Sequence, residues 1–179
     1  LETFDFVVAN PPFSHKIWTN GLNVEEDRFA RFEYGVPPSK NGDYAFLLHI
    51  LKSMKSTGKA AVILPHGVLF RGNAEADIRQ NLVKQGYIKG IIGLPTILFY
   101  GTGIPACIIV LDKEDAHARK GIFMVDASKG FIKDGNKNRL RSPDIHQIVD
   151  VFTKQLALAR YGRMVTLAEI AENGYNLNI

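Results

Sequence analysis

The four residues Asn10-Pro11-Pro12-Phe13, called the NPPF turn below, have the types and spacing best suited to chemistry. Asn10 offers a side-chain carbonyl, Pro11 a backbone carbonyl, and Phe13 a ring face on which a base can stack. Two acceptors that hold an exocyclic amine would draw its lone pair out of conjugation and make the nitrogen more nucleophilic. Such an amine would attack an electrophilic methyl group. An ordinary turn is the alternative, because Asn-Pro and Pro-Pro are common in loops.

An apolar run at residues 4–9 must position the NPPF turn. Its residues hardly alternate between polar and apolar, which predicts a strand buried on both faces of a parallel sheet. Pro11 and Pro12 fix their φ angles and lack an N–H, so the turn that follows is stiff. The sequence therefore predicts a rigid polar turn at the carboxyl end of a strand, where open α/β sheets bind ligands.

The rest of the chain alternates between strand and helix patterns. Apolar residues at helical spacing predict helices, and short apolar runs bounded by turn residues predict strands. The predicted helices are 43–56, 74–85 and 143–160, with one helical turn at 167–171. The first has Asp43 as its N-cap and is ended by Gly58, and the third begins at Ser142-Pro143-Asp144. The predicted strands are 60–64, 87–94, 104–111 and 122–125. The strand 104–111 follows its predecessor without a helix, so it is expected to run antiparallel.

Several polar segments are candidates for contacts with a ligand. Lys40 and Asn41 close a turn-rich stretch, residues 34–42, which predicts either a DNA-facing loop or a solvated surface loop. It ends a connection of about thirty residues in which 24–32 has a weak helical pattern. His66 follows the strand 60–64, so either it lines the same crevice as the NPPF turn or its role is structural. Arg71 lies shortly after it and is a further candidate for DNA contact.

Two other polar segments carry weaker signals. Gly101-Thr102-Gly103 precedes a strand instead of opening a helix, so it is predicted to be a turn and not a phosphate cradle. The basic segment from Lys129 to Arg141 is predicted to be a mobile surface loop, with phosphate contact as the alternative.

Composition is that of one globular domain. The chain has 179 residues, 46% of them hydrophobic and 22% charged, with a formal net charge of +4. That charge is compatible with a polyanionic partner, although basic residues occur along the whole chain. No apolar stretch reaches the roughly 18 residues that span a bilayer. The single cysteine, Cys107, excludes an internal disulfide, and with no signal-peptide pattern this leads us to expect a cytoplasmic protein. The five His have no metal-ligand spacing, so no metal is expected.

The NPPF turn resembles the (D/N/S)PP(Y/F) motif of methyltransferases that act on amino groups, among them enzymes for DNA adenine, RNA bases and protein glutamine. Longer stretches resemble one family, the modification subunits of type I restriction-modification systems. These stretches are 35–38, 43–49, 64–72, 93–95, 99–106, 169–173 and 175–178, so the resemblance covers nearly the whole chain.

The resemblance implies methyl transfer from S-adenosylmethionine to N6 of adenine in DNA, with the base flipped out of the duplex. By position, Asn10 and the Pro11 carbonyl would hold the amine, Pro12 would keep the turn rigid, and Phe13 would stack on the adenine. The implied partners are DNA, a specificity subunit, a motor and nuclease subunit, and a second modification subunit. The alternatives are an RNA-base or protein-glutamine methyltransferase, or a non-catalytic nucleic-acid-binding or assembly module.

The expected fold is α/β, part of a Rossmann-like methyltransferase sheet. Parallel strands, an antiparallel strand toward the C-terminal end and helices on both faces form one domain over 1–179, of which 142–179 is a docking helix and tail.

The resemblance also implies where the cofactor motif lies. In the family, the glycine-rich S-adenosylmethionine loop precedes the NPPF turn, so the main cofactor-binding motif is expected upstream of Leu1. We therefore expect a fragment that does not bind S-adenosylmethionine alone and is inactive in isolation. Its strand 4–9 would be an open edge through which it dimerises or aggregates.

Overall fold

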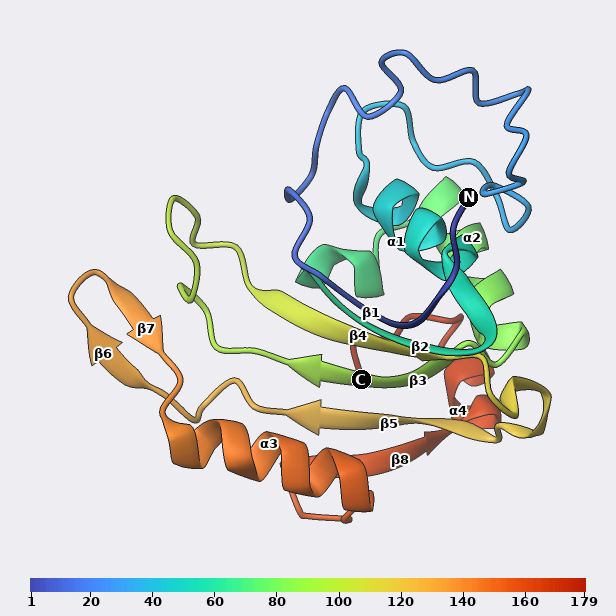
Figure 1. The fold of residues 1–179 in the computed structure, drawn as a ribbon. Helices are drawn as coiled ribbons and strands as arrows, with labels where there is room; N and C mark the ends of the chain where they lie inside the picture. Colours follow the sequence, from blue (N-terminus) through green and yellow to red (C-terminus); the bar gives the residue numbers. More distant parts are fainter.

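The computed structural model describes residues 1–179 and contains one central six-stranded sheet in the order β1-β2-β4-β3-β5-β8 (Figure 1). Its strands are β1 (Phe4–Ala9), β2 (Met54–Pro65), β3 (Ile88–Gly93), β4 (Ala106–Asp112), β5 (Gly121–Asp126) and β8 (Gly162–Thr166). β1 and β2 pair in parallel, as do β3 and β5, whereas β4 is antiparallel to both β2 and β3 and β8 is antiparallel to β5. Four strands, β1, β2, β3 and β5, therefore point in one direction.

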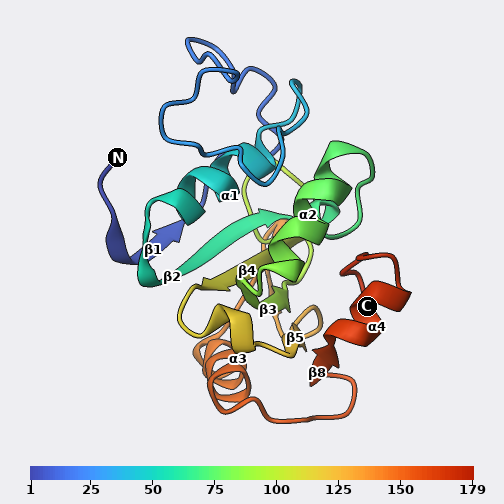
Figure 2. The same cartoon turned by 90° about the vertical axis from the view of Figure 1, so that its right-hand side faces the viewer.

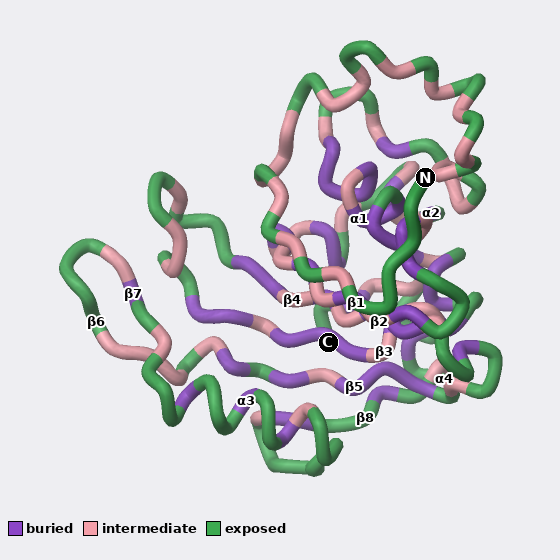
Figure 3. The backbone as a smooth tube through the Cα atoms, viewed as in Figure 1, coloured by how far each residue is buried: buried purple, intermediate pink, exposed green.

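Helices cover both faces of this sheet, as Figure 2 shows end-on. They are α1 (Asp43–Lys52), α2 (Ala74–Lys84), α3 (Ser142–Lys154) and α4 (Leu167–Glu172). The larger hydrophobic cluster joins α1, α2 and α4 to the sheet, and a smaller cluster joins α3 to β3 and β5 on the other face. Burial follows the middle strands of the sheet in Figure 3, because these strands have neighbours on both edges. None of the helices has the length and apolarity needed to cross a membrane.

The predicted α/β sheet is confirmed, but it has two antiparallel strands where one was predicted, because β8 runs antiparallel to β5. The antiparallel strand that the sequence predicted is β4. It runs back between β2 and β3, so it separates two strands that follow each other along the chain. β2 is longer than predicted because its amino end pairs with β1, starting at Phe4 opposite Met54. α1 accordingly ends at Lys52, earlier than predicted, and Ser53 donates hydrogen bonds to His49 and Ile50 at the turn.

Some sequence-based predictions of elements were wrong. The basic segment contains a hairpin of β6 (Ile132–Asp134) and β7 (Lys137–Arg139), where Gly135 has a φ of 60° at the first turn position. β8 was missed because only Gly162 and Val165 of its residues are buried, which leaves little apolar signal. Residues 24–32 form turns and no helix. α3 ends at Lys154, where Gln155 takes a left-handed conformation, and not at residue 160.

The predicted helix caps also differ from those in the structure. Gly42, not Asp43, is the N-cap of α1, and Asp43 lies in its first turn. α3 is capped at Arg141, whose backbone N–H donates to the Asp144 carboxylate over 2.8 Å. In both helices the carboxylate is inside the first turn, where it faces the positive end of the helix dipole.

β1 is an edge strand of the sheet, since β2 is its only partner. Phe6 and Val8 are 77% and 82% exposed, whereas Val7 and Ala9 pack against the larger hydrophobic cluster. One face of the strand is therefore apolar and uncovered within residues 1–179, in contrast to the burial on both faces that its composition predicts.

Candidate active site

The NPPF turn lies at the carboxyl edge of the sheet. β1 ends at Ala9, directly before Asn10, and the carboxyl ends of β2, β3 and β5 meet the same edge because these strands run in the same direction (Figure 1). Asn10 and Pro12 are exposed, and Pro11 and Phe13 are half-buried. The Pro11 carbonyl accepts no hydrogen bond from the backbone. The turn thus has an exposed amide and a carbonyl without a backbone hydrogen bond at the edge where α/β folds bind ligands.

The orientation of the Phe13 ring is fixed by contacts with the loop that follows β3. The Phe13 and Phe99 ring centroids lie 5.7 Å apart with an interplanar angle of 72°, an edge-to-face pair. Phe13 also packs against the smaller hydrophobic cluster. The side chain that would stack on a base is therefore held by the protein on one side.

A buried carboxylate holds the chain directly after the NPPF turn. The Ser14 N–H donates to Asp43 Oδ1 over 2.7 Å, and the carboxylate of Asp43 is completely buried. Ser14 has a φ of 50°, a left-handed conformation that costs energy for a residue other than glycine. A strong hydrogen bond to a charged acceptor offsets that cost and fixes the exit of the turn.

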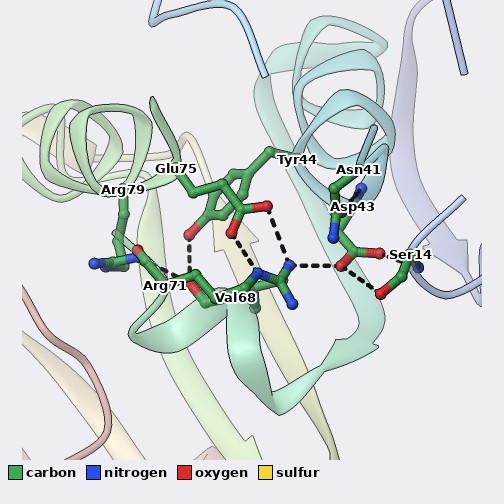
Figure 4. A network of polar contacts seen from close by, with 8 residues as sticks. All are labelled: Ser14, Asn41, Asp43, Tyr44, Val68, Arg71, Glu75 and Arg79. Atoms are coloured by element: carbon green, nitrogen blue, oxygen red, sulfur yellow. Dashed lines mark hydrogen bonds and ion pairs between the residues drawn. The ribbon is translucent and has the colours of Figure 1, made fainter. Parts of the chain in front are cut away.

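Arg71 compensates the charge of Asp43 (Figure 4). Its Nη2 lies 2.6 Å from Asp43 Oδ2, and its Nε lies 2.6 Å from Glu75 Oε2. Burial alone would lower the pKa of Arg71, but hydrogen bonds to Glu75 and Asp43 raise it above its usual value. The guanidinium therefore stays charged and joins α1, α2 and the NPPF turn in one network.

A second set of hydrogen bonds extends the network to the end of the chain. Tyr44 Oη donates to the Val68 carbonyl over 2.7 Å. Arg79 donates to the Val68 and Arg71 carbonyls over 3.1 and 2.9 Å, and to the Tyr175 carbonyl over 2.7 Å. These contacts fix the backbone that carries Arg71, so the support under the NPPF turn reaches the C-terminal tail.

The four residues proposed from sequence for DNA contact lie in different surroundings. Lys40 is exposed, whereas Asn41 Oδ1 accepts the Asp43 N–H over 3.0 Å. Arg71 is committed to the two carboxylates described above. His66 Nε2 lies 2.8 Å from Asn178 Oδ1, which ties it to the C-terminal tail. Asn41 and Arg71 thus belong to the support of the NPPF turn, and DNA contact by these four residues stays a prediction.

Asp43, Ser14 and Phe99 lie at the candidate site, a role that the sequence analysis did not assign to them. Asp43 had the signature of an N-cap, and nothing in the order of residues reveals that it would pair with Arg71, 28 positions later. Phe99 belongs to a loop that only the sheet order brings to Phe13. Such contacts depend on tertiary structure, which a local pattern does not contain.

A cavity of about 880 Å³ lies elsewhere, between β3, β5 and the C-terminal residues 177–179. His66 and Asn178 line it, and no residue of the NPPF turn does. Its walls are mostly apolar, so it is not the place where an exposed amide and carbonyl would hold an amine.

Residues of this chain fit an amine at the NPPF turn better than they fit a nucleoside cofactor. The carboxylate that contacts the end of the turn, Asp43, is hydrogen-bonded to Arg71 and Ser14 and is closed to solvent. Gly101-Thr102-Gly103 forms a turn before β4, as predicted, and opens no helix that could bind a phosphate or ribose. Within residues 1–179 the NPPF turn is therefore a candidate for holding an amine, and no site for a nucleoside cofactor accompanies it.

The cofactor motif expected upstream of Leu1 stays a prediction, because it falls outside residues 1–179. Leu1 itself is 48% exposed and comes shortly before β1, the edge strand of the sheet. A segment joined to Leu1 would therefore reach the open edge of β1 without crossing the packed part of the sheet.

The sheet and its carboxyl-edge site define the class, an α/β fold of the S-adenosylmethionine-dependent methyltransferases. A class I methyltransferase of this kind from Listeria monocytogenes matches 85% of the chain with a TM-score of 0.57 at 19% identity, which supports the fold. The chain belongs to the N-6 DNA Methylase family, whose sequence profile matches residues 1–179. This family and fold imply S-adenosylmethionine as the methyl donor.

Similar proteins are methylase subunits of type I restriction enzymes. The MpnII methylase subunit of Mycoplasma pneumoniae is 33% identical over 98% of this chain and 32% of its own length. The HindI methylase subunit of Haemophilus influenzae is 32% identical over 98% of the chain and 41% of its own length. The methyltransferase subunit of a type I system from Streptococcus thermophilus superposes with a TM-score of 0.88 at 38% identity, over 99% of this chain and 37% of that one. The chain thus spans about a third of the length of such relatives.

Proposed function

We propose that this chain is the target-amine half of a modification subunit that methylates N6 of adenine in duplex DNA within a type I restriction-modification system. The observation that carries the proposal is the NPPF turn at the carboxyl edge of the sheet, with Asn10 exposed and the Pro11 carbonyl free of backbone hydrogen bonds. Membership of the N-6 DNA Methylase family supports it.

In this proposal the adenine leaves the duplex and enters beside Phe13. Its N6 amine donates one hydrogen bond to the Asn10 side-chain carbonyl and one to the Pro11 carbonyl. Phe13 stacks on the base and is itself held by Phe99. Because the two acceptors hold the amine in fixed positions, the nitrogen lone pair is turned out of conjugation with the purine ring. Catalysis by these residues is positioning and electrostatics.

S-adenosylmethionine, when bound, supplies an electrophilic methyl group. We propose that residues upstream of Leu1 bind it, since Asp43, the carboxylate that holds the end of the turn, is paired with Arg71. The uncovered edge and face of β1 offer a place where such residues can continue the sheet. We also propose that its partners are a specificity subunit, a motor and nuclease subunit and a second modification subunit. We propose that this complex acts in the cytoplasm.

The test is methyl transfer by the complete protein that carries this sequence, assembled with its specificity subunit. Labelled S-adenosylmethionine is supplied with duplex DNA, single-stranded RNA or a glutamine peptide. We expect label in DNA alone, at N6 of adenine. Label in RNA or peptide would instead indicate an RNA-base or protein-glutamine methyltransferase. No transfer to any of the three substrates would favour a non-catalytic binding module.

A further inference from the structure

The net charge of the chain is concentrated in one short segment. Residues 129–141 contain five Lys and Arg and one Asp, a net charge of +4, while the rest of the chain contains 17 basic and 17 acidic residues. The whole formal excess of positive charge, +4, therefore resides in these residues. Such a local excess creates a positive potential that attracts polyanions.

This segment is docked onto the loop that follows β3. The Asn138 N–H donates to the Ile97 carbonyl over 2.8 Å, and Asn138 Nδ2 donates to the Thr96 carbonyl over 2.7 Å. Lys137 Nζ lies 3.9 Å from the centre of the Tyr100 ring, a cation–π contact. We call residues 95–103 and 129–141 together the basic arm. Its two parts are connected by these contacts, so its charges have defined positions.

The basic arm projects from the carboxyl edge of the sheet, the edge that carries the NPPF turn (Figure 1). Phe99 of the arm makes the edge-to-face contact with Phe13, at a centroid distance of 5.7 Å. A base bound at Phe13 would thus be within the same neighbourhood as the arm. The chain reverses at Gly101 and Gly103, where no atom would meet an added Cβ within 4 Å, so the tip is open to a large partner.

Three lysines of the arm are free to bind a ligand. Arg139 pairs with Asp134 over 3.1 Å and Arg141 with Asp144 over 2.9 Å, whereas Lys129, Lys133 and Lys137 have no carboxylate partner. Tyr100 is 84% exposed, so its ring is accessible to a partner. The Tyr100 ring also restricts Lys137, which lowers the entropy lost when that ammonium group binds a phosphate.

We propose that the basic arm binds the phosphate backbone of duplex DNA next to the flipped adenine, with Lys133 and Lys137 as phosphate contacts. The proposal rests on the proposed function and adds to it a surface outside the amine site. Its contacts are to phosphate and not to base edges, so they fix the position of the duplex without reading its sequence. This division suits a subunit whose target sequence is read elsewhere.

The test is DNA binding by the complete, assembled protein with Lys133→Ala and Lys137→Ala combined, measured over a series of salt concentrations. Each lost phosphate contact makes the slope of log affinity against log salt shallower by about 0.9. We expect a slope shallower by about two and weaker binding to all duplex sequences alike. The methylation rate at saturating DNA should stay that of the unmodified protein, because neither lysine contacts the amine site.

The matched control combines Lys84→Ala with Lys120→Ala. Both lysines are exposed. Like Lys137, Lys84 lies over a tyrosine ring, with its Nζ 5.6 Å from the centre of the Tyr175 ring. Lys120 directly precedes β5 and therefore lies at the opposite, amino edge of the sheet. The control should leave the salt slope unchanged. An unchanged slope in the arm variant, or an equal change in the control, would overturn the proposal. Failure of the unmodified protein to methylate DNA would instead overturn the proposed function.

Discussion

Asp43 is the residue on which the geometry of the NPPF turn depends most. Its buried carboxylate accepts the Ser14 N–H and pairs with Arg71, which in turn pairs with Glu75. A buried charge is costly unless it is paired and hydrogen-bonded, and here both oxygens have partners. Ser14 is in a strained conformation, so loss of its acceptor should let the turn relax.

Asp43→Asn tests this role. The amide oxygen can still accept the Ser14 N–H, but the charge that faces Arg71 is lost. We expect the free energy of unfolding, measured with urea, to fall by about 1–3 kcal/mol and the methylation rate of the complete protein to fall with it. Ser14→Ala is the control, because its hydroxyl is a distant 3.5 Å from Asp43 and its N–H is retained. That variant should change stability by less than about 0.5 kcal/mol. A normal rate in Asp43→Asn would show that the charge of Asp43 is not needed to position the turn.

A pH dependence is expected from Cys107 in β4. Burial raises the pKa of its thiol from 9.0 to about 12, and burial also raises the pKa of Tyr44. The folded state holds both groups protonated, so the contribution of Cys107 to stability is complete below pH 9 and is lost as the pH rises toward 12, and that of Tyr44 begins to be lost only above pH 10. The free energy of unfolding should therefore fall over this range, by up to about 1.4 kcal/mol per pH unit for each group. Cys107→Ala should reduce that slope by one proton, and an unchanged slope would contradict the assignment.

At the scale of elements, Asn138 connects the β6–β7 hairpin to the loop after β3 by hydrogen bonds. The side chain is 2% exposed, and its Nδ2 donates to the Thr96 carbonyl. Asn138→Asp replaces that donor with an acceptor, so two oxygens would face each other in a buried site. We expect the hairpin to separate, with faster amide hydrogen exchange in residues 95–103 and 132–139 by about tenfold or more, since an unsatisfied buried group costs about 1–3 kcal/mol.

Asn136→Asp provides the control for that change. Asn136 is exposed at the turn of the same hairpin, so the same substitution should leave exchange in the loop nearly unaltered. If Asn138→Asp exchanges like the unmodified protein, the hairpin is held by other contacts.

The sequence predicted strongly periodic elements well and weakly periodic ones poorly. β1 and β3 are short and mostly apolar, and α2 has apolar residues at helical spacing; the predicted positions of all three agree with the structure within one residue at each end. The hairpin was missed although Gly135-Asn136 is a two-residue turn signal, because its flanking residues are mostly charged. The concentration of net charge in residues 129–141 was also visible in the sequence. The docking of this segment on the loop that contacts Phe13 was not visible, since it depends on β3 and β1 sharing a direction within one sheet.

For the candidate site, too, one part could be predicted from the sequence and another part could not. The position of the NPPF turn followed from one apolar run and two prolines. The support of the turn did not, because Asp43, Arg71 and Ser14 come from three separate segments. Long-range polar pairing has no local signature, and it decides whether a predicted polar residue faces a ligand or the protein.

At the scale of the whole molecule, the open edge of β1 governs how residues 1–179 behave alone. Phe4, Phe6 and Val8 are exposed on an edge strand, a combination that promotes pairing between chains. We expect the isolated 179-residue chain to associate in light scattering, with a molecular weight that rises with concentration.

Phe6→Lys combined with Val8→Lys should shift this chain toward the monomer, because charges on an edge strand oppose pairing. Val149→Lys is the control, since Val149 is a 56% exposed apolar residue of α3, away from β1. An isolated chain that stays a monodisperse monomer at high concentration would contradict association through β1.

The central claim is that the NPPF turn holds the target amine, and single-turnover methylation of duplex DNA tests it most directly. The complete protein is compared with its Asn10→Ala and Phe13→Ala variants after their folding has been checked by thermal unfolding. Asn10 and Phe13 are partly or fully exposed, so both variants should fold. We predict a methylation rate lower by about 100-fold or more for Asn10→Ala, as for removal of one transition-state hydrogen bond, and a clear loss for Phe13→Ala. Rates near that of the unmodified protein in both variants would contradict the assignment.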